Sequence, residues 1–132
     1  MSEPSGEPTW LTLDLVKAIH DRQLRPFGGR AGIRDEGALE SALGRRMNRW
    51  AYESADLPTL ASAYPFGIAR NHPFFDDNKR AALLTLVTFL GLNGVDFVAD
   101  EAEAVVLIRD LAGGKVDEDG LTRWIRDNWP AA

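Results

Sequence analysis

The sequence contains no cysteine, no long apolar run and no surplus of positive charge. Without cysteine, a disulfide framework, a thiolate metal site and a cysteine nucleophile are all excluded, and the composition fits a reducing compartment. The formal net charge of −5 argues against binding nucleic acid through overall charge. No apolar stretch reaches the ~18 residues of a membrane-spanning helix. We therefore expect a cytoplasmic protein that contacts neither a membrane nor nucleic acid directly.

The length and composition indicate one folded domain. A chain of 132 residues with 45% hydrophobic and 27% charged residues can bury a core of its own. Residues 1–9 (MSEPSGEPT) lack the basic and apolar regions of a secretory signal peptide. Their Pro, Gly and Ser content predicts a short disordered tail. The helical domain is then expected over residues 10–132.

Apolar residues recur at helical spacing through most of the chain, and strand-like alternation is confined to residues 95–98. The residues from 78 to 92 are apolar around almost the whole circumference of a helix, which is typical of a helix buried in the middle of a fold. The fold class predicted is all-α, with about six helices around a buried central helix. The helices are expected over residues 12–24, from 35, from 57, over 78–92, from 100 and from 117.

The segment HPFFDDNKR, residues 72–80, is the part of the chain that suggests chemistry. It precedes and opens the helix expected at 78, and a helix N-terminus binds anions through its free N–H groups and its dipole. Lys79 and Arg80 add positive charge at that end. Asp76 could hold a hard cation such as Mg²⁺ on phosphate oxygens. The imidazole of His72 could take a proton from an attacking hydroxyl.

Each of these residues also has an ordinary structural interpretation when it is taken alone. Any of residues 76–78 could cap the helix, the two cations could be solvated, and a lone histidine is usually structural. Only the set together favours a phosphate site. Elsewhere, we interpret His20 as a surface residue, Tyr64 and Phe66 as core residues, and the arginines within 45–49 as a solvated helix face.

The segment resembles the signature of the Fic/Doc (death-on-curing) family, which reads His, any, Phe, any, Asp or Glu, Gly, Asn, Gly or Lys, Arg. Lys at position 79 together with Leu at position 83 is similar to the Doc branch. The resemblance extends over nearly the whole chain, and it implies that Phe74 is a core residue that fixes the loop. The positions that match are His72, Phe74, Asp76, Asn78, Lys79 and Arg80.

The resemblance implies a role for each of the polar positions. His72 would be the general base that activates a target hydroxyl, and Asp76 would bind Mg²⁺. Asn78 and the backbone amides around it would form an anion site. Lys79 and Arg80 would hold the phosphates of ATP.

Position 77 departs from the family pattern, because it is Asp where the family prefers Gly or a small residue. The Asp77 side chain could point to solvent, cap the helix or add a second metal ligand. It could also weaken nucleotide binding, because it places negative charge beside the expected anion site.

The function implied by the resemblance is that of a toxin of a type II toxin–antitoxin system. Such a toxin is a protein kinase that transfers the ATP γ-phosphate to a Ser or Thr hydroxyl of a translation factor, with elongation factor Tu as the family expectation, and so inhibits translation. The alternatives are a Fic-type protein AMP transferase and a degenerate, non-catalytic binding module. The inhibitory motif of many Fic enzymes is absent, since Gly32 stands four residues before Glu36 where the motif has Ser or Thr. We therefore expect inhibition by a separate antitoxin protein.

Overall fold

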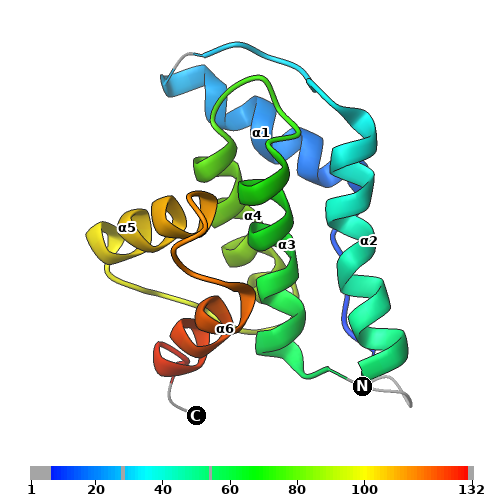
Figure 1. Cartoon of the computed structure of the whole chain (residues 1–132), viewed down its shortest axis with the longest axis vertical. Coiled ribbons are helices and arrows are strands. Elements are labelled where there is room, and N and C mark those ends of the chain that lie inside the picture. Colours follow the sequence, from blue (N-terminus) through cyan, green and yellow to red (C-terminus); the bar gives the residue numbers. More distant parts are fainter. Residues whose placement is uncertain (1–6, 28, 54, 131–132) are drawn as a thin grey trace.

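A computed structural model describes residues 7–27, 29–53 and 55–130 of the chain. These residues form an all-α domain, so the fold class predicted from the sequence is confirmed. The strand-like segment at 95–98 is an irregular loop instead, because none of the residues that the structure describes forms a strand that could pair with it. The helices, shown in Figure 1, are α1 (Leu13–Phe27), α2 (Glu36–Glu53), α3 (Leu57–Asn71), α4 (Asn78–Leu92), α5 (Glu101–Ala112) and α6 (Glu118–Asp127).

Local capping chemistry explains why most of these helices begin where they do. Asp56, Asp100 and Asp117 each stand one residue before a helix, and each carboxylate accepts a hydrogen bond from an N–H in the first turn. The hydroxyl of Thr12 caps α1 in the same way, accepting from the Leu15 N–H at 3.1 Å. Helices were expected to start at 12, 57, 100 and 117, so these boundaries are confirmed to within about a residue.

Helix α3 is the buried centre of the domain. It packs against α2, α4, α5 and α6, which surround it in Figure 1, and its residues from Leu60 to Ile68 are buried apart from Phe66. Helix α4 is more one-sided, because Val87 and Leu92 on it are 39% and 46% exposed. The buried central helix is therefore α3, whereas the sequence had predicted the segment 78–92 for that position.

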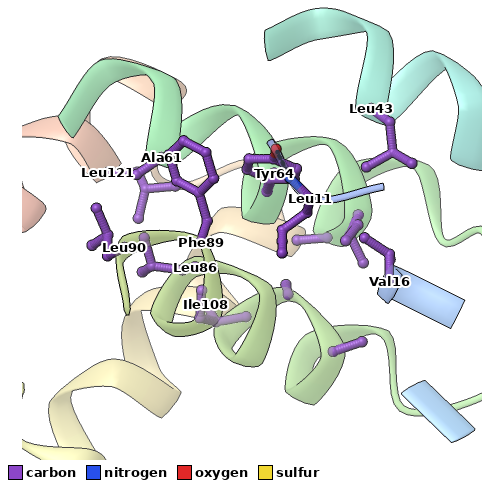
Figure 2. Packing of buried hydrophobic residues seen from close by; sticks show 14 of the residues in the cluster. Leu11, Val16, Leu43, Ala61, Tyr64, Leu86, Phe89, Leu90, Ile108 and Leu121 are labelled. Atoms are coloured by element: carbon purple, nitrogen blue, oxygen red, sulfur yellow. Dashed lines mark hydrogen bonds between the residues drawn. The ribbon is translucent and has the colours of Figure 1, made fainter. Parts of the chain in front are cut away.

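The core lies between α3 and α4 and reaches the start of α1. Figure 2 shows the ring of Tyr64 beside that of Phe89, with centroids 4.8 Å apart. The Tyr64 hydroxyl accepts a hydrogen bond from the Leu11 N–H at 3.0 Å, while the Leu11 carbonyl accepts one from Arg46 of α2 at 3.1 Å. Tyr64 is fully buried, so its prediction as a core residue is confirmed.

The basic cluster on α2 was predicted wrongly as a solvated face. Arg45 and Arg49 both pair with Glu118 at the start of α6, a carboxylate that is only 8% exposed. Phe66 is half-buried rather than core, because Arg45 and Arg70 lie over its ring at 4.7 and 4.9 Å from the centroid. These charged side chains connect α2 to α3 and α6 through ion pairs and ring contacts, so the cluster stabilises the packing of these helices.

The beginning of the described chain is attached to the domain. The Thr9 N–H donates to Oδ1 of Asn93 at 2.7 Å, and Nδ2 of Asn93 donates to the Thr9 carbonyl at 3.0 Å. Of the tail predicted over 1–9, residues 1–6 lie outside the described part of the chain. No helix among the described residues is long and apolar enough to span a membrane.

Candidate active site

The motif occupies the loop between α3 and α4 and the first turn of α4. His72 is the C-cap of α3, and its N–H donates to the Ile68 carbonyl at 3.1 Å. Asp77 stands immediately before α4. These two are the only non-glycine residues with positive φ in the described chain, at 49° and 59°. The loop is therefore bracketed by two residues in a conformation that L-amino acids avoid.

Phe74 anchors the loop in the core, as predicted from the family resemblance. It is 1% exposed, and its ring is parallel to the imidazole of His20 with centroids 3.9 Å apart. Nε2 of His20 donates to the Asp76 carbonyl at 2.7 Å. His20 is itself only 1% exposed, so its interpretation as a surface residue was wrong. The fold brings α1 beneath the motif although 56 positions separate the two residues.

Asn78 closes the loop on itself. Its Oδ1 accepts from the Phe74 N–H and its Nδ2 donates to the Phe74 carbonyl, both at 3.0 Å. The side-chain amide thus holds the loop, and a contact from Asn78 to an anion would come from its backbone N–H. The first intrahelical donor of α4 is Ala81, which bonds to the Asp77 carbonyl at 2.9 Å. The N–H groups of residues 78–80 precede it and point out of the helix start, as an anion site requires.

A second segment, residues 29–35, runs antiparallel beside the motif. The N–H groups of Arg34 and Asp35 both donate to the Pro73 carbonyl, at 2.7 and 3.0 Å. The Arg34 guanidinium reaches further and donates to the His72 carbonyl from Nε at 2.9 Å and from Nη2 at 2.6 Å. Nη2 also donates to the Asn71 carbonyl at 3.1 Å. Sequence reasoning missed this arginine, whose only signal was its place after a glycine-rich loop.

Asp76 is exposed and opens toward the solvent side of the motif. Its Oδ1 accepts from the Asp77 N–H at 3.0 Å, and its Oδ2 accepts from the Arg30 N–H at 3.4 Å. The chain passes close to this carboxylate at Gly29, where φ is +116° and a Cβ would lie 3.1 Å from Oδ2. Within the described residues no cluster of three or more His, Asp or Glu could hold a metal alone. One carboxylate with substrate phosphates and water is nevertheless an ordinary Mg²⁺ site, so Asp76 fits that ion.

Asp77 neither caps α4 nor points freely to solvent. It makes no side-chain capping hydrogen bond, its side chain is 19% exposed, and Oδ1 lies 3.6 Å from Nη1 of Arg80. Its Oδ2 is buried without a hydrogen-bond partner. Two of the interpretations left open by the sequence, a solvated residue and a helix cap, are therefore wrong. The positive φ at this position is also a physical reason for glycine, which adopts it without strain.

A cavity of about 700 Å³ opens at the motif. One wall is formed by the motif, and it brings together all the polar residues predicted for the site. The opposite wall is α5, with Leu83 of α4 between the two. A second hollow, of about 520 Å³, lies along α2 and the start of α6 and contains none of the motif residues. The 700 Å³ cavity is lined by His72, Phe75, Asp76, Asp77, Asn78, Lys79, Arg80, Leu83, Glu101, Val105, Ile108 and Arg109.

Comparison with known proteins identifies the family of this chain. The model of the Fic/DOC family matches residues 10–90, from the start of the core to nearly the end of α4. The chain is 36% identical over 110 residues to "Protein kinase doc" of Escherichia phage P1, covering 83% of this chain and 86% of that protein. It is 37% identical over 102 residues to "Toxin Doc" of Mycolicibacterium smegmatis, covering 72% and 76%. Because the family model matches more than half of the chain and these relatives are similar over most of their length, this chain belongs to the Fic/DOC family.

Proposed function

We propose that the chain is a protein kinase that transfers the γ-phosphate of ATP to a Ser or Thr hydroxyl of another protein. The observation that carries the proposal is the cavity at the start of α4, which the imidazole of His72 lines together with carboxylates, among them Asp76, and cations, among them Lys79 and Arg80. The relative from phage P1 is named a protein kinase. Phosphoryl transfer needs mainly positioning and neutralisation of charge, and these residue types supply both.

Each residue has a distinct task in this proposal. His72 takes the proton of the attacking hydroxyl, whose oxygen bonds to the γ-phosphorus while the bond from that phosphorus to the bridging oxygen breaks and ADP leaves. Lys79 and Arg80, with the N–H groups at the start of α4, hold the phosphates. Asp76 would hold Mg²⁺, which neutralises phosphate charge when it is bound. Asn78 keeps the loop closed around these groups.

The pair Lys79 and Leu83 favours γ-phosphate over AMP transfer. By the family resemblance, AMP-transferring relatives carry Gly and a second Arg at these positions, which make room for the triphosphate along the helix and grip its far end. Here Lys79 lines the cavity and takes up part of that room, and Leu83 cannot bind phosphate. The nucleotide is then expected to bind with its terminal phosphate near His72 and Asp76.

We further propose that the chain is the toxin of a toxin–antitoxin pair. One relative is named a toxin, and the internal inhibitory motif of many Fic enzymes is missing from the sequence. A separate antitoxin would therefore supply the inhibition, through a disordered segment that folds as a helix in a groove of this domain. Elongation factor Tu remains the expected target, by family resemblance.

The test compares ATP labelled at the α-phosphate with ATP labelled at the γ-phosphate. The full chain is incubated with each nucleotide and with bacterial lysate or purified elongation factor Tu. Label from the γ position alone, with a mass increase of one phosphoryl group on a Ser or Thr, supports the kinase. Label from the α position would instead make the chain an AMP transferase. If the folded chain transfers label from neither position, the kinase proposal fails and the non-catalytic binding module is the remaining alternative.

Two variants connect the activity to the site. His72→Ala is expected to lose at least ~10²-fold in transfer rate while it keeps its fold, because the side chain is exposed on a loop. Lys79→Ala should weaken ATP binding, whereas Lys115→Ala, an exposed lysine outside the cavity, should not. Wild-type rates in the His72 variant would remove that residue from the mechanism.

A further inference from the structure

We propose that two side chains outside the motif, Arg34 and His20, are positioning residues that fix His72 and Asp76 for the reaction. Neither side chain lines the cavity, so neither is expected to touch the nucleotide. Both bind backbone carbonyls of the motif loop, one at each end. The inference rests on the proposed function, because it assigns how that site is held in its working geometry.

Arg34 holds the end of the loop that carries the base. His72 has φ 49° and ψ 56°, so it is held in the left-handed region against its own preference. The carbonyls of Asn71 and His72 lie at the C-terminal end of α3, where the helix itself offers them no donor. The planar guanidinium of Arg34 donates to both carbonyls at 2.6 to 3.1 Å. The direction in which the His72 side chain leaves the backbone is thereby set by Arg34.

His20 holds the end of the loop that carries the metal ligand. Its buried Nε2 donates to the Asp76 carbonyl at 2.7 Å, and its ring rests flat on Phe74. This bond fixes the peptide unit between Asp76 and Asp77, from which α4 begins. The same peptide unit supplies the N–H that Asp76 Oδ1 accepts at 3.0 Å. His20 therefore fixes the carboxylate of Asp76 through the backbone, without contacting it.

A merely stabilising role and a positioning role predict different results, and Arg70 provides the matched control. Arg70 also donates from its guanidinium to two carbonyls, those of Leu111 and Val116, at 2.7 and 3.4 Å. Its side chain extends from α3 to the end of α5 and the turn after it, and it lines no part of the cavity. Arg34→Ala and Arg70→Ala thus each remove hydrogen bonds from a guanidinium to backbone carbonyls. Only the first is expected to disturb the motif.

The kinetic experiment separates kcat from KM in the full chain. Arg34→Ala should lower kcat at least ~10-fold while KM for ATP stays close to wild type, because a misplaced base slows the chemistry and not the binding. Arg34→Lys, which keeps one donor, should recover part of the loss. Arg70→Ala should keep wild-type kcat even where its melting temperature falls. Wild-type kcat in Arg34→Ala, or equal losses in the two alanine variants, would overturn the role of Arg34.

Two variants of His20 separate its hydrogen bond from its ring. His20→Gln keeps an N–H donor, and His20→Phe keeps an aromatic ring on Phe74 but loses the donor. The Phe variant should need several-fold more Mg²⁺ for half-maximal rate, and the Gln variant should lie between it and wild type. Amide exchange gives a readout that needs no activity, because the Asp77 N–H, which donates to Asp76 Oδ1 at 3.0 Å, should exchange faster in His20→Phe than in wild type. An unchanged Mg²⁺ requirement or an unchanged Asp77 exchange rate in His20→Phe would overturn the role of His20.

Amide hydrogen exchange tests the same inference without any activity. The His72 N–H is bonded to the Ile68 carbonyl, and the Phe75 N–H to the Gly32 carbonyl at 3.3 Å. Both should exchange faster in Arg34→Ala than in wild type or in Arg70→Ala. If the wild-type chain transfers no phosphate, the proposed function fails, and the exchange rates still decide the role of Arg34. If exchange at His72 is unchanged, the positioning role fails even in an active kinase.

Discussion

Replacing Asp77 with glycine should stabilise this protein, although it removes an ion pair. Asp77 lies just before α4 with φ 59°, where a side chain is strained and glycine is not. Its carboxylate makes no capping hydrogen bond. One of its oxygens is buried without a hydrogen-bond partner, and the other reaches Arg80 only at 3.6 Å. The wild-type residue thus has a strained backbone and an incompletely satisfied side chain.

The size of the effect follows from four contributions. Relief of the left-handed conformation is worth about 1 kcal/mol, and removal of a buried, unsatisfied oxygen about another 1 kcal/mol. The loss of the partly exposed pair with Arg80 costs ~0.2–1 kcal/mol. The greater chain entropy of unfolded glycine costs ~0.5–1 kcal/mol. The net lies between roughly 0 and 1.3 kcal/mol, so we expect Asp77→Gly to raise the free energy of unfolding by about 0.7 kcal/mol, which is a few °C in Tm.

Urea unfolding of three variants tests this reasoning at neutral pH. Asp77→Ala removes the carboxylate but keeps the strained Cβ and avoids the entropy cost of glycine, so it should be up to about 0.5 kcal/mol less stable than Asp77→Gly. Asp100 is the matched control, because it precedes α5 with φ −59° and caps it through the Glu103 N–H at 2.9 Å. Asp100→Gly should destabilise by a few tenths of a kcal/mol. An Asp77→Gly protein less stable than Asp77→Ala would refute the assignment of strain.

Three further predictions concern the nucleotide and the network of charges. Asp77→Gly should also lower KM for ATP by about 1.4- to 5-fold, since a competing charge worth ~0.2–1 kcal/mol leaves Arg80; an unchanged KM would show that the carboxylate does not compete. Glu118→Gln should cost roughly 2 kcal/mol of unfolding free energy in urea, because it removes the buried counter-charge that its two arginines on α2 share: Arg45, which is 44% exposed, loses its ion pair, and Arg49 keeps the exposed Glu53. The hydrogen bonds from Arg126 lower the pKa of Asp56 from 3.8 to about 2. The pair adds about 0.5 kcal/mol of stability over Asp56→Asn, because it is so exposed. This stability should be nearly complete above pH 4, fall as the pH passes through 2, and be gone about one pH unit lower in thermal melts; a difference that does not shrink between pH 4 and pH 2 would contradict it.

The helices could be predicted because their signals are local. Each capping residue stands three positions before the N–H that it satisfies, so the capping residue and the helix start are adjacent in the sequence. The motif was equally accessible, since its residues fall within nine consecutive positions and the loop and helix bring them to one cavity. The burial of Phe74 also followed from the resemblance, and the structure places its ring in the core.

The residues that hold the motif could not be predicted, because their partners are distant in sequence. Arg34 binds a carbonyl 38 positions away, and His20 one that is 56 positions away. Both bonds go to backbone groups, which carry no residue-specific signal. Glu118 presents the same difficulty, since it looks like an ordinary acidic residue in the first turn of α6 until the fold places Arg45 and Arg49 beside it. Buried charge can be recognised in a sequence only when its partner is local.

Several features that lower local stability lie together at the start of α4 and in the loop before it. Helix α4 begins with two cations and no acidic residue, against the dipole, whereas α5 and α6 begin with acidic residues. The residue before it is left-handed and does not cap it, and the loop that leads to it starts at a second left-handed residue, His72. Such conflicts cluster where a protein trades stability for function. A bound phosphate would offset the charges of Lys79 and Arg80 and accept from the N–H groups of the first turn. Of these conflicts, a bound phosphate would relieve the one between the cations and the helix dipole, which is an argument for phosphate chemistry that does not depend on the family match.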